Sequence, residues 1–303
     1  MDLSVVVPTL NGRDRLAACL DALAAHVPDA EVIVANGPSA DGTTGMVRDR
    51  DDVDVLVEIS DRSVNVARNA GIEVARGDAV ALVDFDRRVT DGWLEAALDG
   101  LESAPVVTGP SLPVNGEGQA VDGPEDRRIA GREVRYFTSG NVAFRRGVLE
   151  ELDGFDEYLS VGGARDAAHR LAGLEYEIAW DERLSVGHEP LAEDGHDWRE
   201  KYRALGYRLA KNYGVRPGVP RTLIGQALCD ARSTLEDVIR GEGAPTAWIG
   251  NGWRVVTGAV DGATDGLVAR ARDRSPTRNP RGISVRHDRA VALYDRRDGR
   301  VEP

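Results

Sequence analysis

Short apolar runs and helical patterns alternate over the first 86 residues of the chain. Runs of strand length and segments with helical spacing follow one another at 3–8, 15–25, 31–35, 42–50, 54–59, 63–75 and 79–86. Such alternation with short links is typical of parallel strands, because a chain that leaves one strand returns parallel to it only through a long crossover, usually a helix. The sequence therefore predicts an α/β domain in which helices flank a mainly parallel sheet.

The carboxyl ends of three predicted strands are candidate binding positions. In open α/β sheets ligands bind outside these ends, which places residues 8–12, 36–39 and 84–88 along one rim. The glycine fingerprint GxGxxG is missing after the first strand, and so is a phosphate loop of the form GxxxxGKS or GxxxxGKT. These absences argue against a dinucleotide-dependent oxidoreductase and against a P-loop nucleotide hydrolase.

Two aspartates stand at the end of the fourth predicted strand, in the run VALVDFDRR. Asp84 and Asp86 are spaced i and i+2, so both carboxylates can supply oxygen ligands to a hard divalent cation that bridges a diphosphate. The same spacing also occurs in ordinary turns and helix caps. The position at the rim favours the cation site.

Four segments in a fixed order resemble the donor half of family 2 glycosyltransferases, which have the GT-A fold of nucleotide-diphospho-sugar transferases. They are VVVPTLNGRDRLAACLDAL, EVIVANGPSADGT, ARNAGIEVARGD and VALVDFD. SGNVAFRRGVLEELDGFDE at 139–157 resembles the acceptor half, so the resemblance covers about Leu3 to His188. Together with the composition it points to the haloarchaeal members that assemble lipid-linked glycans for S-layer N-glycosylation.

The resemblance implies roles for individual residues of this chain. It assigns the donor nucleotide-sugar to Pro8, Thr9, Asn11, Asn36, Arg68 and Asp84, and a Mg²⁺ or Mn²⁺ ion to Asp84, Asp86 and His188. Asn36 stands where the family usually has an aspartate, so it either contacts the base or only forms a turn with the glycine and proline that follow. His188 is either a metal ligand or a hydrogen-bonded histidine at a strand end.

The expected general base is less clear, because the usual acidic pair is absent. In VGGARDAAHRL, Gly163 and Ala164 occupy the positions of the acids, and Asp166 is the acid that remains. Three alternatives follow: Asp166 removes the acceptor proton, a neighbour such as Asp156 or Glu157 does so, or the protein binds a donor without transferring it. Asp166 is also well placed as an ordinary acid in the first turn of a helix.

The chain divides by its patterns into three parts. Residues 1–194 are the predicted GT-A domain, with a donor half at 1–110 and an acceptor half at 111–194. A helical region at 195–272 and a basic, flexible tail at 273–303 complete the chain.

The helical region suggests contact with either the protein or a membrane. Amphipathic stripes predict helices with one buried face, whereas Trp248 and Trp253 near an arginine-rich tail also suit a membrane interface. No window reaches the roughly 18 apolar residues of a membrane span, and no leader precedes the first strand. We therefore expect a cytoplasmic protein, with peripheral contact on the cytoplasmic face of the membrane as one option.

The charge balance indicates which kinds of binding partner suit the protein. The formal net charge is −13, yet Lys201 and Lys211 are the only lysines among 38 basic residues. Acidic excess with little lysine suits a halophile, where salt screens self-repulsion, although an acidic protein from a GC-rich mesophile also fits. Nucleic acid is excluded as a partner of so acidic a body. Cys19 and Cys229 have no metal-ligand spacing and suggest no disulfide framework.

Together these features predict a metal-dependent glycosyltransferase with an inverting mechanism. Its donor would be a nucleotide-sugar carrying a hexose or hexuronic acid, and its acceptor a polyprenyl- or dolichyl-phosphate-linked glycan. A catalytically silent relative that acts as a scaffold is the second hypothesis, motivated by Gly163 and Ala164. A sugar nucleotidyltransferase is the third, but LNGRDR lacks the glycine- and arginine-rich loop it needs.

Overall fold

The computed structural model describes residues 1–114, 120–189, 197–239, 245–273, 275 and 278–297. The chain forms two compact units. The sheet unit consists of residues 1–125, 135–191 and the C-terminal segment from 281, and the helical unit of residues 126–134 and 192–280.

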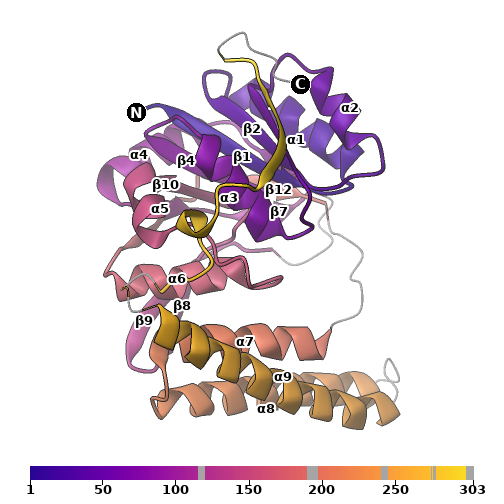
Figure 1. Ribbon diagram of the computed structural model, residues 1–303, viewed down its shortest axis with the longest axis vertical. Coiled ribbons are helices and arrows are strands. Elements are labelled where there is room, and N and C mark those ends of the chain that lie inside the picture. Colours follow the sequence, from indigo (N-terminus) through magenta and orange to yellow (C-terminus); the bar gives the residue numbers. More distant parts are fainter. Residues whose placement is uncertain (115–119, 190–196, 240–244, 274, 276–277, 298–303) are drawn as a thin grey trace. The chain divides into compact units, whose positions relative to one another are not determined.

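The sheet unit is built on an eight-stranded sheet (Figure 1). Its strands are β1 (Leu3–Thr9), β2 (Glu31–Asn36), β3 (Val55–Ile59), β4 (Ala79–Val83), β6 (Val106–Thr108), β10 (Asn141–Arg145), β11 (Ile178–Trp180) and β13 (Ala290–Asp295). They lie in the order β11-β6-β10-β4-β1-β2-β3-β13. Strands β4, β1, β2 and β3 are mutually parallel, whereas β10 and β13 run antiparallel to their neighbours. The predicted mainly parallel α/β fold is confirmed.

Helices cover both faces of this sheet because the strands are apolar on both sides. α1 (Arg13–His26), α2 (Thr43–Arg48) and α4 (Trp93–Ser103) share one core cluster with β1, β2 and β4. α3 (Val64–Val74) packs on the opposite face. Its approach is so close that a Cβ on Gly71 would come within 2.3 Å of a methyl group of Val6. Gly71 thus lets α3 lie directly on β1.

Two small sheets and two short helices are also present. They are β5 (Arg87–Val89), β12 (Val186–His188) and β7 (Ser111–Pro113) in one sheet, β8 (Glu125–Ile129) and β9 (Arg132–Tyr136) in another, and the helices α5 (Arg146–Leu152) and α6 (Gly163–Gly173). Most of the sheet β8-β9 belongs to the helical unit. Strand β5 begins directly after the two aspartates of the rim. The sheet β5-β12-β7 therefore starts next to the candidate site.

The C-terminal segment differs from the prediction of a flexible tail. A 3-10 turn η1 (Ile283–Val285) leads into β13, which pairs antiparallel with β3 and closes that edge of the sheet. Arg289 has no exposed side-chain surface and pairs with Glu73 at 2.9 Å and Glu157 at 2.5 Å. The prediction was wrong for 281–297 because arginines there are matched by acids of the sheet unit. Residues 274, 276–277 and 298–303 lie outside the described residues.

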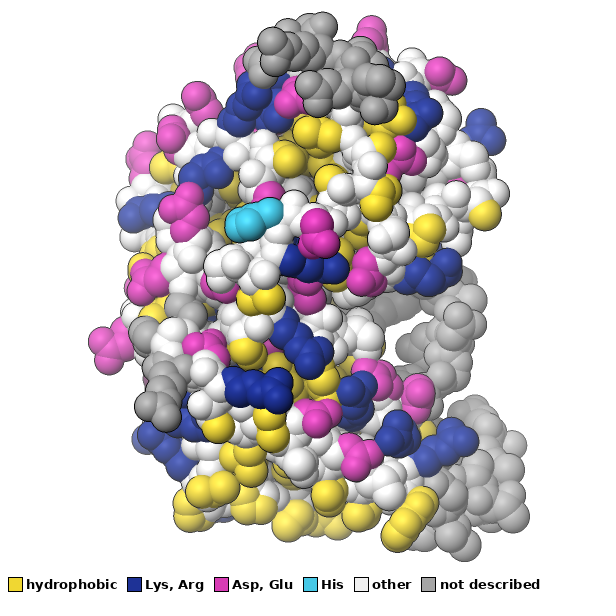
Figure 2. Space-filling model, in the orientation of Figure 1, with side chains coloured by type: hydrophobic (Ala, Val, Ile, Leu, Met, Phe, Trp, Pro, Cys, Tyr) yellow, Lys and Arg dark blue, Asp and Glu magenta, His cyan; other side chains and the backbone are white. Residues whose placement is uncertain are grey.

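The helical unit confirms the predicted helical appendage. Its helices are α7 (Trp198–Tyr213), α8 (Gly218–Ile239) and α9 (Pro245–Arg272). α9 approaches α7 along the i, i+4 series Gly258, Gly262 and Gly266, where a Cβ would lie 2.0 to 2.4 Å from carbonyl oxygens of α7. Hydrophobic side chains gather along the lower edge in Figure 2, where Figure 1 places α8 and α9. None of the helices in the described part of the chain has both the length and the apolar character needed to cross a membrane.

Candidate functional site

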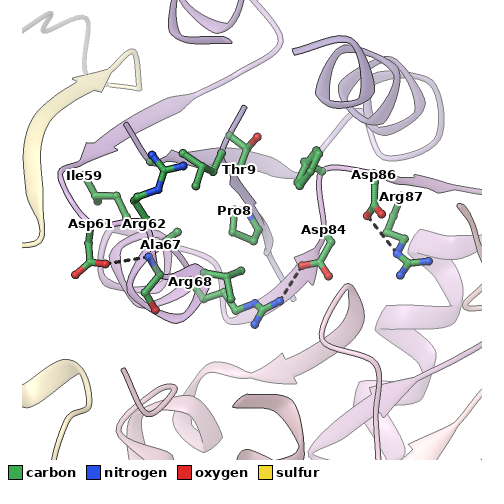
Figure 3. Close-up of a pocket in the computed structure, with 15 residues that line it drawn as sticks. Pro8, Thr9, Ile59, Asp61, Arg62, Ala67, Arg68, Asp84, Asp86 and Arg87 are labelled. Carbon is green, nitrogen blue, oxygen red and sulfur yellow. Dashed lines mark hydrogen bonds and ion pairs between the residues drawn. The ribbon is translucent and has the colours of Figure 1, made fainter. Parts of the chain in front are cut away.

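A pocket of about 340 Å³ opens at the carboxyl ends of β1, β3 and β4 (Figure 3). Its walls come from the loops that follow these strands and from the first turns of α3. The sheet order explains its position, since β2 and β3 lie on one side of β1 and β4 on the other. Loops that leave neighbouring strands in opposite directions create a crevice, which is where such sheets bind ligands.

Arg68 lines the pocket and hydrogen-bonds three side chains, of which Asp84 also lines it. It projects from α3 with 5% of its side chain exposed. Its guanidinium donates to Asp84 Oδ1 at 2.9 Å, to Ser139 Oγ at 2.9 Å and to Asn65 Oδ1 at 3.1 Å. The predicted donor residues Pro8, Thr9, Arg68 and Asp84 all line this pocket, as does the predicted metal ligand Asp86.

The two rim aspartates differ in their surroundings. Asp84 fits because residue 140 is glycine: a Cβ on Gly140 would lie 2.5 Å from Asp84 Oδ2. Asp86 is more buried, and its Oδ1 lies 3.4 Å from Arg87 Nε. Burial raises the pKa of Asp86, the nearby charge of Asp84 raises it further, and Arg87 opposes both effects. The acidic end of the pocket therefore favours a bound cation, which would stabilise both charged carboxylates.

Several buried polar atoms of the pocket lack a hydrogen-bond partner. Among the described residues seven buried side-chain atoms have none, and four of them belong to residues that line this pocket: Thr9 Oγ1, Ser63 Oγ, Arg68 Nε and Arg87 Nε. Unpaired buried groups are rare in folded proteins and call for an explanation. All four groups can donate a hydrogen bond, so an anionic ligand such as a phosphate would satisfy them.

Asp61 is a pocket residue that the sequence interpretation missed. It follows β3 and lies at the end of the pocket remote from Asp84 and Asp86, next to Arg62 (Figure 3). Its Oδ1 accepts from the backbone N–H of Ser63 at 2.9 Å. The sequence could have predicted this position, because residue 61 follows the third predicted strand. The predicted rim included the ends of the other three strands but not the end of this one.

Asn36 and Asn11 take structural roles instead of lining the pocket. Asn36 is fully buried; its Nδ2 donates to Thr44 Oγ1 at 2.9 Å and its Oδ1 accepts from Ser39 Oγ at 2.8 Å. Asn11 Oδ1 accepts from the backbone N–H of Ala40 at 2.8 Å. Neither residue belongs to the pocket wall. Both ends of the Asn36 amide are thus bonded to side chains of the same loop, and its contact with the base stays a prediction.

His188 lies beside the acidic end without joining the pocket wall. It is paired with Arg87 in the β5–β12 register, and its Nδ1 is 3.3 Å from Ser111 Oγ. Burial lowers the pKa of His188, and the positive charge of Arg87 lowers it further, although Asp86 opposes them. The imidazole is thus near enough to feel the charges of both Asp86 and Arg87, and its role as a metal ligand stays a prediction.

The candidate bases are all engaged in contacts within the fold. Asp166 has no exposed surface, and its Oδ2 accepts from Arg170 Nε at 2.9 Å. Asp156 is fully buried and accepts from the backbone of Tyr158 at 3.0 Å. Glu157 forms an ion pair with Arg289 at 2.5 Å.

These surroundings favour the alternative that Asp166 is an acid in the first turn of a helix, and its role as the general base stays a prediction. Arg170 holds its carboxylate and also donates to the carbonyl oxygens of Leu152 and Gly154, at 2.6 and 2.9 Å. This bonding fixes α6 against the end of α5, which is a structural role.

The end of the pocket at Asp84 and Asp86 fits a divalent cation whose coordination is completed by the bound substrate. Within the described ranges no group of three or more His, Cys, Asp or Glu side chains is arranged to hold a metal. Mg²⁺ usually takes one or two carboxylates and completes its coordination with water and substrate phosphates. Asp84 and Asp86 suit this arrangement, and the buried donors around them suit the phosphates.

Comparison with known proteins settles the family. The model described as Glycosyl transferase family 2 matches residues 4–153, which span β1 to the end of α5 and include every residue of the pocket wall. The chain belongs to glycosyltransferase family 2. The sheet unit of this glycosyltransferase accordingly has the GT-A fold.

Two relatives of this glycosyltransferase come from the haloarchaeon Haloferax volcanii. Glycosyltransferase AglE is 25% identical over 222 residues, which cover 66% of this chain and 71% of that protein. Glucosyl-dolichyl phosphate glucuronosyltransferase is 30% identical over 122 residues, which cover 36% of this chain and 39% of that protein.

A solved structure supports the fold of this glycosyltransferase. The mannosyltransferase PcManGT from Pyrobaculum calidifontis, in complex with GDP-Man and Mn²⁺, superposes with a TM-score of 0.56 at 21% identity. The match covers 90% of this chain and 87% of that chain. At this identity it shows a shared fold.

Proposed function

We propose that this glycosyltransferase moves a sugar from a nucleoside-diphosphate donor to a hydroxyl of a dolichyl-phosphate-linked glycan. The observation that carries the proposal is the pocket itself: its wall combines two carboxylates, Asp84 and Asp86, with buried donors on Thr9, Ser63, Arg68 and Arg87 that make no hydrogen bond. Donors alone would suit any anion. Donors together with carboxylates suit a diphosphate that arrives with a cation.

The charges of the pocket set the direction of the donor. A diphosphate is favoured beside Arg68 and Arg87 and is repelled by Asp61 at the opposite end. The base then lies toward Asp61, where a carboxylate accepts hydrogen bonds from N–H groups. Apolar side chains of Leu10 and Ile59 line the same pocket and can contact the base. Pro8 and Thr9 would then flank the nucleotide between the two ends.

Mg²⁺ or Mn²⁺ fits between the donor and the rim. Asp84 and Asp86 would hold it, and when bound it would neutralise the charge that develops on the leaving diphosphate. Arg68 orients Asp84 through its 2.9 Å ion pair, and Arg87 stands 3.4 Å from Asp86. These arginines also supply positive charge to the leaving group, so the protein's own residues share that task.

Relatives support the acceptor and the setting. A protein 30% identical over its matched part is named for a dolichyl-phosphate acceptor and a glucuronosyl donor, and both relatives above are haloarchaeal. With the acidic, lysine-poor composition, this suits cytoplasmic assembly of a lipid-linked glycan for archaeal protein N-glycosylation. A hexose or hexuronic acid would be the transferred sugar, with inversion at its anomeric carbon as the family resemblance implies.

A comparison of lipid-linked glycans tests the whole proposal. Lipid extracts from cells with and without the gene are analysed by mass spectrometry, which identifies the acceptor and the added sugar together. We expect the cells without the gene to accumulate a dolichyl-linked glycan one hexose or hexuronic acid shorter. Complementation with the gene should restore the full length, whereas a gene carrying Asp86→Asn should not.

An assay with purified protein distinguishes the alternatives. Donor binding without sugar transfer or donor hydrolysis, across UDP- and GDP-linked sugars and dolichyl-linked acceptors, would favour the catalytically silent scaffold. Unchanged lipid-linked glycans in the cells would contradict the acceptor, even if transfer to another acceptor occurs.

A further inference from the structure

Helices α8 and α9 carry apolar side chains on the side that we call the outer face. It consists of Ile224, Leu228 and Leu235 on α8 and Trp253, Val256 and Val260 on α9. The spacings of three, four and seven residues place each set on one side of its helix. Exposure is high throughout: 72% for Trp253, 66% for Leu228 and 60% for Ile224. Figure 2 shows hydrophobic side chains gathered along the lower edge of the view.

The opposite sides of the two helices are already used in packing. The glycines of α9 lie against the backbone of α7, and the inner side chains of α8 and α9 surround the core of the helical unit: Leu223, Ala227, Val255 and Ala259. The outer face therefore has no role in the core of its own unit. A single exposed apolar residue is ordinary, but a contiguous apolar face usually marks an interaction surface.

Charges are divided between the two sides in the same way. The carboxylates of α8 and α9 whose side chains the structure describes all pair with cations of α7: Asp230 with Lys201, Asp261 with Arg199, and Asp265 with Arg203. Arg221 lies on the exposed side of α8, three residues before Ile224. Among the described side chains the outer face is thus apolar with Arg221 at its margin, on a protein of net charge −13.

An arginine cluster lies at the end of the unit where α7 and α9 finish and α8 begins. Its members are Arg132, Arg216, Arg270 and Arg278. Arg270 donates to the carbonyl oxygens of Lys211 and Asn212 at 2.9 and 3.2 Å. Burial lowers the pKa of Arg270, and the charges of the other three arginines lower it further. Beside Arg216, Val215 is 84% exposed, so apolar and positive groups occur together here as well.

We propose that the outer face and the arginine cluster dock the helical unit on an anionic lipid bilayer. The apolar side chains would enter the boundary between headgroups and acyl chains, and the arginines would bind lipid phosphates. Trp253 suits that boundary, because its ring is apolar and its indole N–H is polar. A dimer formed through this face is a poorer fit, because the residues that define the outer face include no acid that could pair with these arginines. The inference does not depend on the donor site or on the proposed acceptor.

Vesicle flotation with the full chain tests the proposal. Native protein is mixed with vesicles of phosphatidylglycerol and phosphatidylcholine, or of phosphatidylcholine alone, in KCl that keeps it folded. We expect it to float with the anionic vesicles. Leu228→Glu combined with Trp253→Glu should lower the ratio of bound to free protein at least about tenfold, because each side chain loses more than 1.4 kcal/mol of apolar transfer.

Matched variants separate docking from general effects. Val291→Glu, at an equally exposed valine of β13, should float like native protein. Arg216→Gln with Arg221→Gln should weaken binding to anionic vesicles by about fivefold per arginine at physiological ionic strength, and less as salt rises. Thermal melts should be unchanged in these variants.

Three results would overturn the proposal. They are native protein that stays with the soluble fraction, a Leu228→Glu and Trp253→Glu variant that floats like native, and a lipid-free dimer that this variant converts to monomers. The last result would assign the outer face to a second copy of the chain.

Discussion

Asp166 and Arg170 form an ion pair of 2.9 Å in which neither side chain has any exposed surface. Arg170 also binds two carbonyl oxygens at the end of α5, so the pair connects α6 to the segment that precedes it. A carboxylate held in this way is part of the fold. This distinguishes Asp166 from the rim aspartates, which line an open pocket.

Asp166→Asn should destabilise the protein more than it slows transfer. Breaking a buried ion pair leaves one charge uncompensated, which costs about 3–5 kcal/mol. Denaturant unfolding measures this loss, and the transfer rate per folded molecule should stay near native. The control is Asp261→Asn, whose exposed pair with Arg199 contributes about 0.2–1 kcal/mol. A stable Asp166→Asn protein whose transfer rate drops by about 10² to 10⁴ would show instead that Asp166 is the base.

Local patterns were sufficient to predict the first half of the fold. The runs at 3–8, 31–35 and 54–59 became β1, β2 and β3 with shifts of one residue, because strands buried on both faces are apolar throughout. The same placement predicted that Pro8 and Asp84 approach each other, and both line the pocket.

Features that depend on distant partners escaped prediction. From the sequence, Asn36 was a candidate contact for the base. In the structure its amide is hydrogen-bonded to Ser39 and Thr44. Arg289 looked like part of a solvated tail, since nothing local shows that it pairs with Glu73 and Glu157. Such contacts join residues far apart in the sequence, so composition and periodicity do not reveal them.

Arg68→Lys should weaken donor binding and reduce stability. Lysine keeps the charge but cannot reach Asn65, Asp84 and Ser139 at once, because it lacks the planar guanidinium fork. We expect the dissociation constant of UDP or GDP to rise at least about tenfold and the free energy of unfolding to fall by about 1–3 kcal/mol. Calorimetric titration and urea unfolding measure the two effects. The exposed Arg183→Lys serves as control, and native affinity in Arg68→Lys would refute the role of Arg68 in the pocket.

Glu31→Gln should show a stability loss that depends on pH. Burial alone raises the pKa of Glu31, but hydrogen bonds from Ser4, from the backbone of Arg76 and from Arg297 outweigh it, so the pKa lies below its usual range. A depressed pKa stabilises the fold above the unfolded value of about 4.3, and this contribution disappears as pH falls through the folded value. The difference from native protein should thus be largest near neutral pH and shrink below about pH 4.3. A difference that is independent of pH would contradict this.

High salt should stabilise the protein. A net charge of −13 creates self-repulsion that is screened when the Debye length falls to about 3 Å at 1 M salt. We expect the thermal midpoint to rise steadily between 0.1 and about 2 M KCl, measured by circular dichroism. Equal stability in dilute buffer would refute the interpretation of the composition as halophilic.

The most direct test of the donor site is a calorimetric titration of UDP and GDP into the protein, with MnCl₂ or with EDTA. If Asp84 and Asp86 hold a cation on the diphosphate, Mn²⁺ should tighten binding of the preferred nucleotide at least about tenfold in native protein. Asp86→Asn, alone or with Asp84→Asn, should abolish this gain while leaving the fold and the weak cation-free binding to Arg68 and Arg87 in place. Equal affinities with Mn²⁺ and with EDTA in native protein, or a full Mn²⁺ effect in the double variant, would contradict the account.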